Sequence, residues 1–445
     1  MADSNLGADG SLRATLLRAK GLSLLRGALD AGSVREALAL LELLVSGKPD
    51  PEEIAAATGK MWSGLAREAE NETLLKDAWR SALIRAVLDD ENPWSLAAER
   101  REKPSPALRD QASRELRAVQ GLFRLGCGGL LAAVHAAAPE LEGMWASRDF
   151  GAEPRDNSTP RREVARRLAG ADDWGECLAD LEAHFALHGA GVFGRYRAFR
   201  WRAFRRRAGA LEPVNEPDPV SLAELGGHEE EREPLLRNTE RFLAGLPARH
   251  ALVYGQPGTG KSANVKAVLA HYAGRGLKAV EVAREDLAEL PRTLAALRGR
   301  GIKCVVFVDD LSFEEEEVGY KALKALLEGS IEAPPQNVLL YATSNRRNLI
   351  RESFTERDED VHPHETAREK LSLAERFGLQ ITFLAPDPKQ YLEMVENLAD
   401  LRGLDLPREE LRERALAWER RISARSGRVA RQFVDELQAE LAEEG

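Results

Sequence analysis

One eight-residue segment has the composition and spacing of a phosphate-binding loop. The segment GQPGTGKS comprises Gly255, Gln256, Pro257, Gly258, Thr259, Gly260, Lys261 and Ser262. It matches the pattern G-x-x-x-x-G-K-[ST], in which glycines let successive backbone N–H groups turn toward a phosphate. The lysine of this pattern reaches the β- and γ-phosphates, and the hydroxyl of the last residue binds Mg²⁺. The segment therefore predicts a binding site for ATP and Mg²⁺, with Lys261 on the phosphates and Ser262 on the metal.

The residues on either side of this loop have the pattern that its mechanism requires. The run ALVY precedes it and predicts a strand, and SANVKAVLAHYA follows it and predicts a helix. A helix that starts at the loop adds the partial positive charge of its N-terminus to the phosphate site. A chance match to the loop pattern would not be expected to lie between a predicted strand and a predicted helix.

Two aspartates downstream supply the acids that such a site needs. The apolar run CVVFV ends in Asp309 and Asp310. A phosphate-bound Mg²⁺ is held by a carboxylate at the end of a neighbouring strand, and Asp309 fits this role. Asp310 is placed to orient or deprotonate the attacking water. The alternative is a strand that simply ends in a polar turn, and the phosphate loop in the same chain makes that alternative weaker.

The pattern of the chain changes between its two halves. Residues 1–208 are rich in Ala, Leu, Arg and Glu with apolar spacings of three and four, as in SVREALALLELLV, which predicts an N-terminal helical domain. Prolines and paired glycines then interrupt the periodicity and predict a linker over 209–220. In 221–385, short apolar runs such as HALVYG and VLLYATSN alternate with amphipathic stretches, which indicates a parallel sheet covered by helices. Residues 386–445 return to helices alone.

From Ser221 to the C-terminus the chain resembles the AAA+ ATPases. The fold class that the resemblance implies is an α/β P-loop NTPase core with a small C-terminal helical lid, here preceded by an all-α domain. The strand NVLLYATSN resembles the family's sensor strand, which implies that Asn345 contacts the γ-phosphate or the attacking water. The segment LSLAERFGLQITF resembles the one that carries the arginine finger, with Arg376 at the matching position. The segment SGRVARQFVDEL resembles the start of the lid helix, with Arg428 as the second sensor and Arg425 and Arg431 as competitors.

The resemblance implies an ATP hydrolase that drives or gates a conformational change in an oligomer. A finger such as Arg376 acts on a neighbouring subunit, which implies a homo-oligomeric ring or spiral with an unknown protein client. The motifs look closest to an uncharacterised bacterial family of AAA+ proteins, related in style to replication initiators and helicase loaders. Two alternatives therefore stay open: a nucleic-acid-associated initiator or loader, and a nucleotide-gated scaffold with negligible turnover. Most AAA+ hydrolases have Glu where this chain has the shorter Asp310, which predicts either slow hydrolysis or a site that a partner or polynucleotide completes.

An arginine-rich stretch with interleaved aromatic residues, GRYRAFRWRAFRRRAG, precedes the linker. On a helical wheel its aromatic side chains share one arc and most of its arginines lie opposite. As a helix, the stretch could dock on the protein itself. Alternatively, Arg195–Arg207 could grip nucleic acid or an acidic partner through phosphate contacts and base stacking.

The composition is ordinary for a protein that works in water. The 445 residues are 43% hydrophobic and 31% charged, and the net charge of −10 argues against a protein that coats nucleic acid along its whole surface. The N-terminal residues predict no secretory signal, no apolar run is long enough to span a membrane, and three widely spaced cysteines suit a reducing compartment. These features predict a cytoplasmic protein without a membrane partner.

Overall fold

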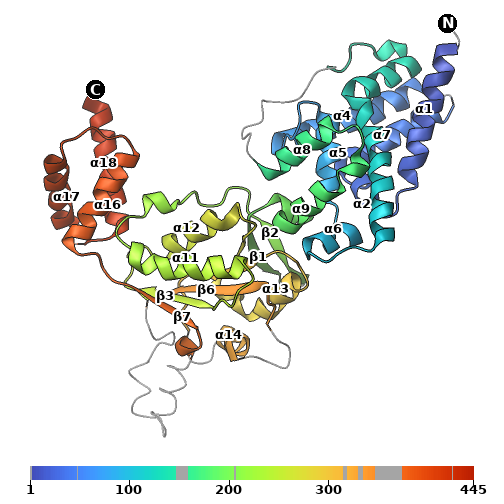
Figure 1. Cartoon of the computed structure of the whole chain (residues 1–445). Coiled ribbons are helices and arrows are strands. Elements are labelled where there is room, and N and C mark those ends of the chain that lie inside the picture. The colour runs from blue at the N-terminus through green and yellow to red at the C-terminus, as the bar shows by residue number, and fades with distance from the viewer. Residues whose placement is uncertain are drawn as a thin grey trace. The chain divides into compact units, whose positions relative to one another are not determined.

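The computed structural model describes residues 3–47, 49–146, 159–204, 207–313, 318–328, 334–345, 373–422 and 424–444. The chain divides into two compact units, which are coloured along the chain in Figure 1. The helical unit contains Met1–Arg195 together with Arg300–Ile302. The sheet unit contains Tyr196–Gly299 and Lys303–Gly445.

The described part of the helical unit consists of α-helices joined by short turns. Its helices are α1 (Asp3–Lys20), α2 (Arg26–Leu29), α3 (Gly32–Val45), α4 (Pro51–Asn71), α5 (Ala78–Asp89), α6 (Pro93–Glu99), α7 (Pro106–Ala137), α8 (Pro160–Gly170), α9 (Leu178–His188) and α10 (Val192–Arg195). Local signals start several of them. The Asp50 carboxylate accepts a hydrogen bond from the backbone N–H of Glu52, and Pro51 occupies the first turn of α4, where its missing N–H is harmless. The all-α prediction for this part of the chain is confirmed.

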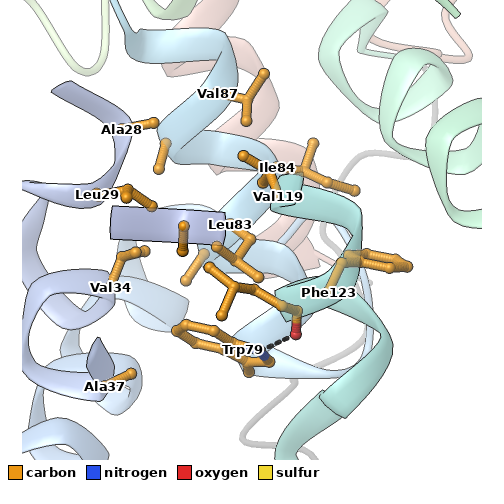
Figure 2. Close-up of a cluster of buried hydrophobic side chains, with 14 of the residues drawn as sticks. Ala28, Leu29, Val34, Ala37, Trp79, Leu83, Ile84, Val87, Val119 and Phe123 are labelled. Atoms are coloured by element: carbon orange, nitrogen blue, oxygen red, sulfur yellow. Dashed lines mark hydrogen bonds between the residues drawn. The ribbon is translucent and has the colours of Figure 1, made fainter. Parts of the chain in front are cut away.

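The core of the helical unit is apolar and contains a buried tryptophan (Figure 2). Trp79 of α5 is fully buried, and its indole Nε1 donates a hydrogen bond to the backbone carbonyl of Leu122 at 2.9 Å. Val34 of α3 and Phe123 of α7 lie in the same cluster. A tryptophan can be buried in this way because its one polar atom has a partner.

The described part of the sheet unit contains a seven-stranded, mostly parallel sheet. The strands are β1 (Ala198–Phe204), β2 (Arg207–Pro213), β3 (Ala251–Gly255), β4 (Lys278–Glu281), β5 (Cys304–Val308), β6 (Val338–Ser344) and β7 (Leu379–Phe383). Their order across the sheet is β2-β1-β4-β5-β6-β3-β7, and only the pair β1 and β2 is antiparallel. Strands β5 and β6 are buried along their whole length, as expected for central parallel strands covered on both faces. This arrangement confirms the predicted α/β P-loop core.

Helices cover the sheet and form a separate C-terminal cluster. The helices next to the sheet are α11 (Glu229–Leu243), α12 (Lys261–Ala273), α13 (Leu290–Leu297) and α14 (Val318–Glu328). Figure 1 shows α11 and α12 together on one face of the sheet and α14 on the other. The lid comprises α16 (Pro388–Leu401), α17 (Arg408–Ile422) and α18 (Gly427–Glu444), which share an apolar core that includes Tyr391 and Val434. Among the described residues, no helix is both long and apolar enough to cross a membrane.

The helix predicted for the arginine-rich stretch is wrong, because the stretch forms most of the β1–β2 hairpin. Phe199 and Trp201 are almost fully buried, whereas Arg200 and Arg202 are exposed. Burial therefore repeats every second residue, the period of a strand, and not every third or fourth residue. Strand β1 joins the sheet beside β4, so the sheet unit begins at Tyr196. The domain boundary expected after residue 208 thus lies earlier, and the segment 209–220 expected as a linker includes most of β2.

Candidate nucleotide-binding site

The phosphate loop connects the end of β3 to the start of α12, as the sequence predicts. Gly255 ends β3, and a Cβ atom there would lie 2.0 Å from the carbonyl oxygen of Phe383 on the neighbouring β7. Gly260 precedes α12 with φ +88°, in the left-handed region that favours glycine. The close approach of β7 and the left-handed turn explain why glycine is needed at these two positions.

Lys261 is held over the loop by three hydrogen bonds. Its Nζ donates to the carbonyls of Gly255 at 2.9 Å and Gln256 at 2.8 Å, and to Oδ1 of Asn345 at 3.0 Å. Burial lowers the pKa of Lys261, while the charges of Asp310 and Asp309 act in the opposite direction. The ammonium group is therefore fixed at the phosphate loop, where it could bind the phosphates of a nucleotide.

Ser262 and Asp309 meet at the start of α12. The Ser262 Oγ donates a hydrogen bond of 2.5 Å to Oδ1 of Asp309. A serine hydroxyl and a carboxylate are oxygen ligands of the kind that Mg²⁺ prefers, and both come from rigid element ends. The donor set therefore fits the predicted magnesium position.

Thr343 is a residue of this site that sequence reasoning missed. Its hydroxyl donates to Oδ1 of Asp309 at 2.5 Å and accepts a hydrogen bond from the backbone N–H of Asp310 at 2.9 Å. It thereby fixes the positions of both aspartates. The sequence feature that could have identified Thr343 is its position in the predicted strand VLLYATSN, two residues before Asn345.

Asp310 lies at the surface in a left-handed backbone conformation. Its φ is +50°, which is uncommon for a residue other than glycine and is best tolerated by Asn and Asp. Its Oδ1 accepts a hydrogen bond of 2.6 Å from Nδ2 of Asn345. Because Oδ1 of Asn345 also accepts the bond from Lys261, one amide group links the loop lysine to Asp310.

A cavity of about 450 Å³ brings most of the predicted site residues together. Its lining includes residues 257–262 of the loop, Asp309, Asp310, Thr343, Asn345, Arg428 and Arg431. Gly255 and Gln256 are not part of this lining, and neither is Arg376, which lies in the turn before β7.

The three candidate arginines of the lid differ in their surroundings. Arg425 forms an ion pair with Glu419 and does not line the cavity. Arg428, in the first turn of α18, lines the cavity and is exposed. Arg431 also lines it and forms an ion pair of 3.2 Å with Glu224. The geometry therefore favours Arg428, with Arg431 beside it, over Arg425.

Several arginines of the stretch Arg195–Arg207 have acidic partners. Arg200 is bonded to Glu281 of β4 at 2.8 Å, and Arg202 to Glu212 of β2 at 3.1 Å. These pairs neutralise much of the exposed face that was expected to attract an acidic ligand. Arg205 and Arg206 of the same stretch lie outside the described residues. Nucleic-acid binding stays a prediction.

A known protein family matches the C-terminal part of the chain. The family described as "Protein of unknown function (DUF815)" matches residues 194–441. The chain is also 26% identical over 196 residues to the 26S protease regulatory subunit 6A of Caenorhabditis elegans. That alignment covers 37% of this chain and 45% of the relative, so the chain spans less than half of the relative's length.

Similar solved structures include the Thermotoga maritima RuvB Holliday junction branch migration motor and a point mutant of that protein. Each is 18% identical to this chain with a TM-score of 0.32. Each comparison covers 49% of this chain and 72% of the other.

Proposed function

The chain belongs to the DUF815 family of proteins of unknown function, and we propose that it binds MgATP and hydrolyses it to ADP and phosphate. The observation that carries the proposal is the hydrogen-bonded array at the carboxyl ends of three adjacent strands, β5, β6 and β3. In this array Lys261 is joined through Asn345 to Asp310, and Ser262 is joined to Asp309.

Each side chain in the array has one role in the proposed reaction. Lys261 and the backbone N–H groups of the loop hold the phosphates, and Ser262 and Asp309 hold the metal ion. When bound, Mg²⁺ supplies positive charge that neutralises the β- and γ-phosphate oxygens. Asp310 and Asn345 orient the attacking water, and the carboxylate of Asp310 accepts its proton.

The coupling of hydrolysis to movement belongs to the same proposal. Arg428 at the start of α18 lines the cavity together with the phosphate loop, so it can report the nucleotide state to the lid. Arg376 does not line the cavity of its own chain. This position suits a finger that acts on a neighbouring subunit of a homo-oligomer, where its charge would stabilise the transferred phosphoryl group.

Two measurements on four proteins test this proposal. Binding of a fluorescent ATP analogue and release of phosphate are measured for the wild type, Lys261→Ala, Asp310→Asn and Lys266→Ala. Lys261→Ala should lose ATP binding. Asp310→Asn should keep binding and lose most phosphate release. Lys266→Ala is the matched control, because Lys266 lies on the same helix but pairs with Asp218.

Two outcomes would contradict the proposal. Equal ATP binding by the wild type and Lys261→Ala would remove the phosphate loop from the site. Tight ATP binding by the wild type without phosphate release, at protein concentrations that drive assembly, would instead support the nucleotide-gated scaffold.

A further inference from the structure

Two segments that are separated along the chain by α11 and β3 line the cavity of the candidate site. One is the phosphate loop, through residues 257–262. The other is the segment 220–226, which precedes α11 and lines the cavity through four of its residues. A nucleotide whose phosphates occupy the loop must place its nucleoside in the remainder of the cavity, which the segment 220–226 helps to enclose. Nucleotide binding therefore depends on how these two segments are placed relative to each other.

Arg232 of α11 connects the two segments. Its side chain is 8% exposed, and its Nη1 donates hydrogen bonds to the backbone carbonyl of Leu225 at 2.6 Å and to Oδ1 of Asn264 at 3.1 Å. A terminal nitrogen of a guanidinium carries two hydrogens, so Nη1 can serve both acceptors at once. Leu225 and Asn264 line the cavity, whereas Arg232 is not part of the lining. Arg232 thus joins two parts of the cavity wall from behind.

Asn264 passes this contact on to the phosphate loop. It lies in the first turn of α12, and its Nδ2 donates to the carbonyl of Gly260 at 3.0 Å, while its backbone N–H donates to the same oxygen at 2.9 Å. Because Oδ1 is held by Arg232, the amide presents Nδ2 to Gly260. The C=O and N–H of a trans peptide point in opposite directions, so this carbonyl directs the N–H of Lys261 away from the helix and toward the phosphate site.

An ion pair does not account for the burial of Arg232. The carboxylate that pairs with it, Glu229, lies 3.9 Å from Nη2 and is 64% exposed, so water screens the attraction. A buried guanidinium with such a partner contributes little to stability. Its short contacts are instead to oxygen atoms of two residues that line the cavity.

We propose that Arg232 is a positioning residue for nucleotide binding, which holds the phosphate loop and the segment 220–226 at the separation that a bound nucleotide requires. The inference rests on the proposed function, because it requires a nucleotide in the cavity. Arg232 acts on the loop through Asn264 and on the other segment through Leu225, without contacting the nucleotide itself.

Displacement of a fluorescent ATP analogue by ATP tests this inference. Arg232→Met keeps an unbranched apolar stem but has no donor, and it should weaken ATP binding by about 10- to 100-fold. Arg232→Lys supplies an ammonium group with several hydrogens and should recover part of this loss. Arg237→Met is the matched control and should bind ATP like the wild type, because Arg237 lies on the same helix but forms an exposed pair with Glu233.

Steady-state kinetics separate positioning from a general loss of folded protein. For Arg232→Met the KM for ATP should rise by the same factor as the loss of affinity, while kcat should change by less than about threefold, because the residues proposed for the chemical step are unchanged. A smaller amount of folded enzyme would instead lower the apparent kcat at an unchanged KM. That result would overturn the positioning role.

Inorganic tripolyphosphate distinguishes the two contacts of Arg232, because it can occupy the loop but has no nucleoside. Asn264→Ala removes only the contact with the loop and should weaken ATP and tripolyphosphate by similar factors. Arg232→Met also releases Leu225, so it should weaken ATP by at least about threefold more than it weakens tripolyphosphate. Equal losses for the two ligands in Arg232→Met would overturn the role of Arg232 in positioning the segment 220–226.

The outcomes also distinguish this inference from the proposed function. Failure of the wild type to bind ATP would refute the proposed function itself. ATP binding with the same affinity in the wild type, Arg232→Met and Asn264→Ala would refute only the role of Arg232. If Arg232→Met fails to fold, Asn264→Ala still decides, because an unchanged ATP affinity in that variant would remove the connection from Arg232 to the phosphate loop.

Discussion

At the scale of single residues, Asp310 combines the proposed water-orienting position with a backbone conformation that L-residues seldom adopt. Because φ is +50° at this position, the protein is expected to be less stable with a residue that carries a Cβ atom there than with glycine. The conformation turns the carboxylate toward Asn345, so the strain and the hydrogen bond occur together. Strain of this kind is often found at functional positions.

This conformation predicts different stabilities for two variants that lose the same carboxylate. Asp310→Ala and Asp310→Gly should both lose phosphate release, but the glycine variant should be more stable by about 1 kcal/mol. Urea denaturation gives the two free energies of unfolding. The same pair of substitutions at Asp309, where φ is not positive, is the control and should favour alanine. Equal stability of the two Asp310 variants would show that the residue is not strained in solution.

Thr343 supports the reaction that we propose without contacting the water itself. Thr343→Val has nearly the same shape but loses the bonds to Asp309 and to the N–H of Asp310, so phosphate release should fall by about 10- to 100-fold. Thr343→Ser keeps the hydroxyl and should stay within about threefold of the wild type. The concentration of Mg²⁺ that gives half-maximal rate should rise for the valine variant only. A valine variant with wild-type rate and wild-type Mg²⁺ dependence would exclude this positioning role.

At the scale of elements, the β1–β2 hairpin extends the sheet beyond β4. Its buried side is aromatic, and its exposed side carries arginines that are paired with glutamates on the neighbouring strands. Cross-strand ion pairs and packed aromatics are the usual stabilising contacts of such edges. The arginines therefore have a structural role here that the isolated segment does not reveal.

The hairpin depends on close packing of Gly209 against Trp201. A Cβ atom on Gly209 would lie 2.3 Å from the indole ring, so Gly209→Ala should lower the free energy of unfolding by about 1 to 3 kcal/mol. Gly274→Ala, where nothing lies within 4 Å of the added atom, is the matched control and should be nearly neutral. Trp201→Leu replaces the indole ring with a smaller side chain, so Gly209→Ala should then lower the free energy of unfolding by less. A double-mutant cycle measures this coupling. Additive effects of the two substitutions would contradict the contact.

At the scale of the whole molecule, the chain contributes to the helical unit twice. The residues Arg300–Ile302 lie between α13 and β5 in the sequence but belong to the helical unit. Arg300 donates to the carboxylate of Glu99 at 2.8 and 2.6 Å, and the backbone N–H of Gly301 donates to the same carboxylate. Glu99 is fully buried, so its charge depends on this partner.

Because the charge of Glu99 depends on Arg300, Glu99→Gln should change stability in opposite directions when Arg300 is present and when it is replaced. In the wild-type chain, Glu99→Gln breaks the pair with Arg300 and should destabilise the helical unit by about 3 kcal/mol. In an Arg300→Met background, which keeps residues 300–302 in place but lacks the guanidinium, the same substitution removes an unpaired buried charge and should stabilise the protein. Urea unfolding followed by tryptophan fluorescence compares the four proteins. A change of the same sign in both backgrounds would refute this account.

The sequence alone determined the phosphate loop, the order of strands and helices that follows it, and the helical character of the N-terminal half. These are local properties, because glycines, a strand before the loop and a helix after it impose the backbone path within a few residues. The pattern of the arginine-rich stretch was misread, since aromatic and basic residues fit both a helical arc and the two faces of a strand. The stretch forms a strand because it pairs with β2 and β4 in the sheet.

Only the tertiary structure brought together residues that are distant in the chain. The contact of Thr343 with Asp309 and the inclusion of Arg300 in the helical unit depend on which segments pack together. Such contacts leave no periodic or spaced signal, because each involves one side chain and a partner far away in the sequence. The residues that we propose bind phosphate could thus be predicted from the sequence, whereas Thr343, which positions the acids, could be found only in the folded protein.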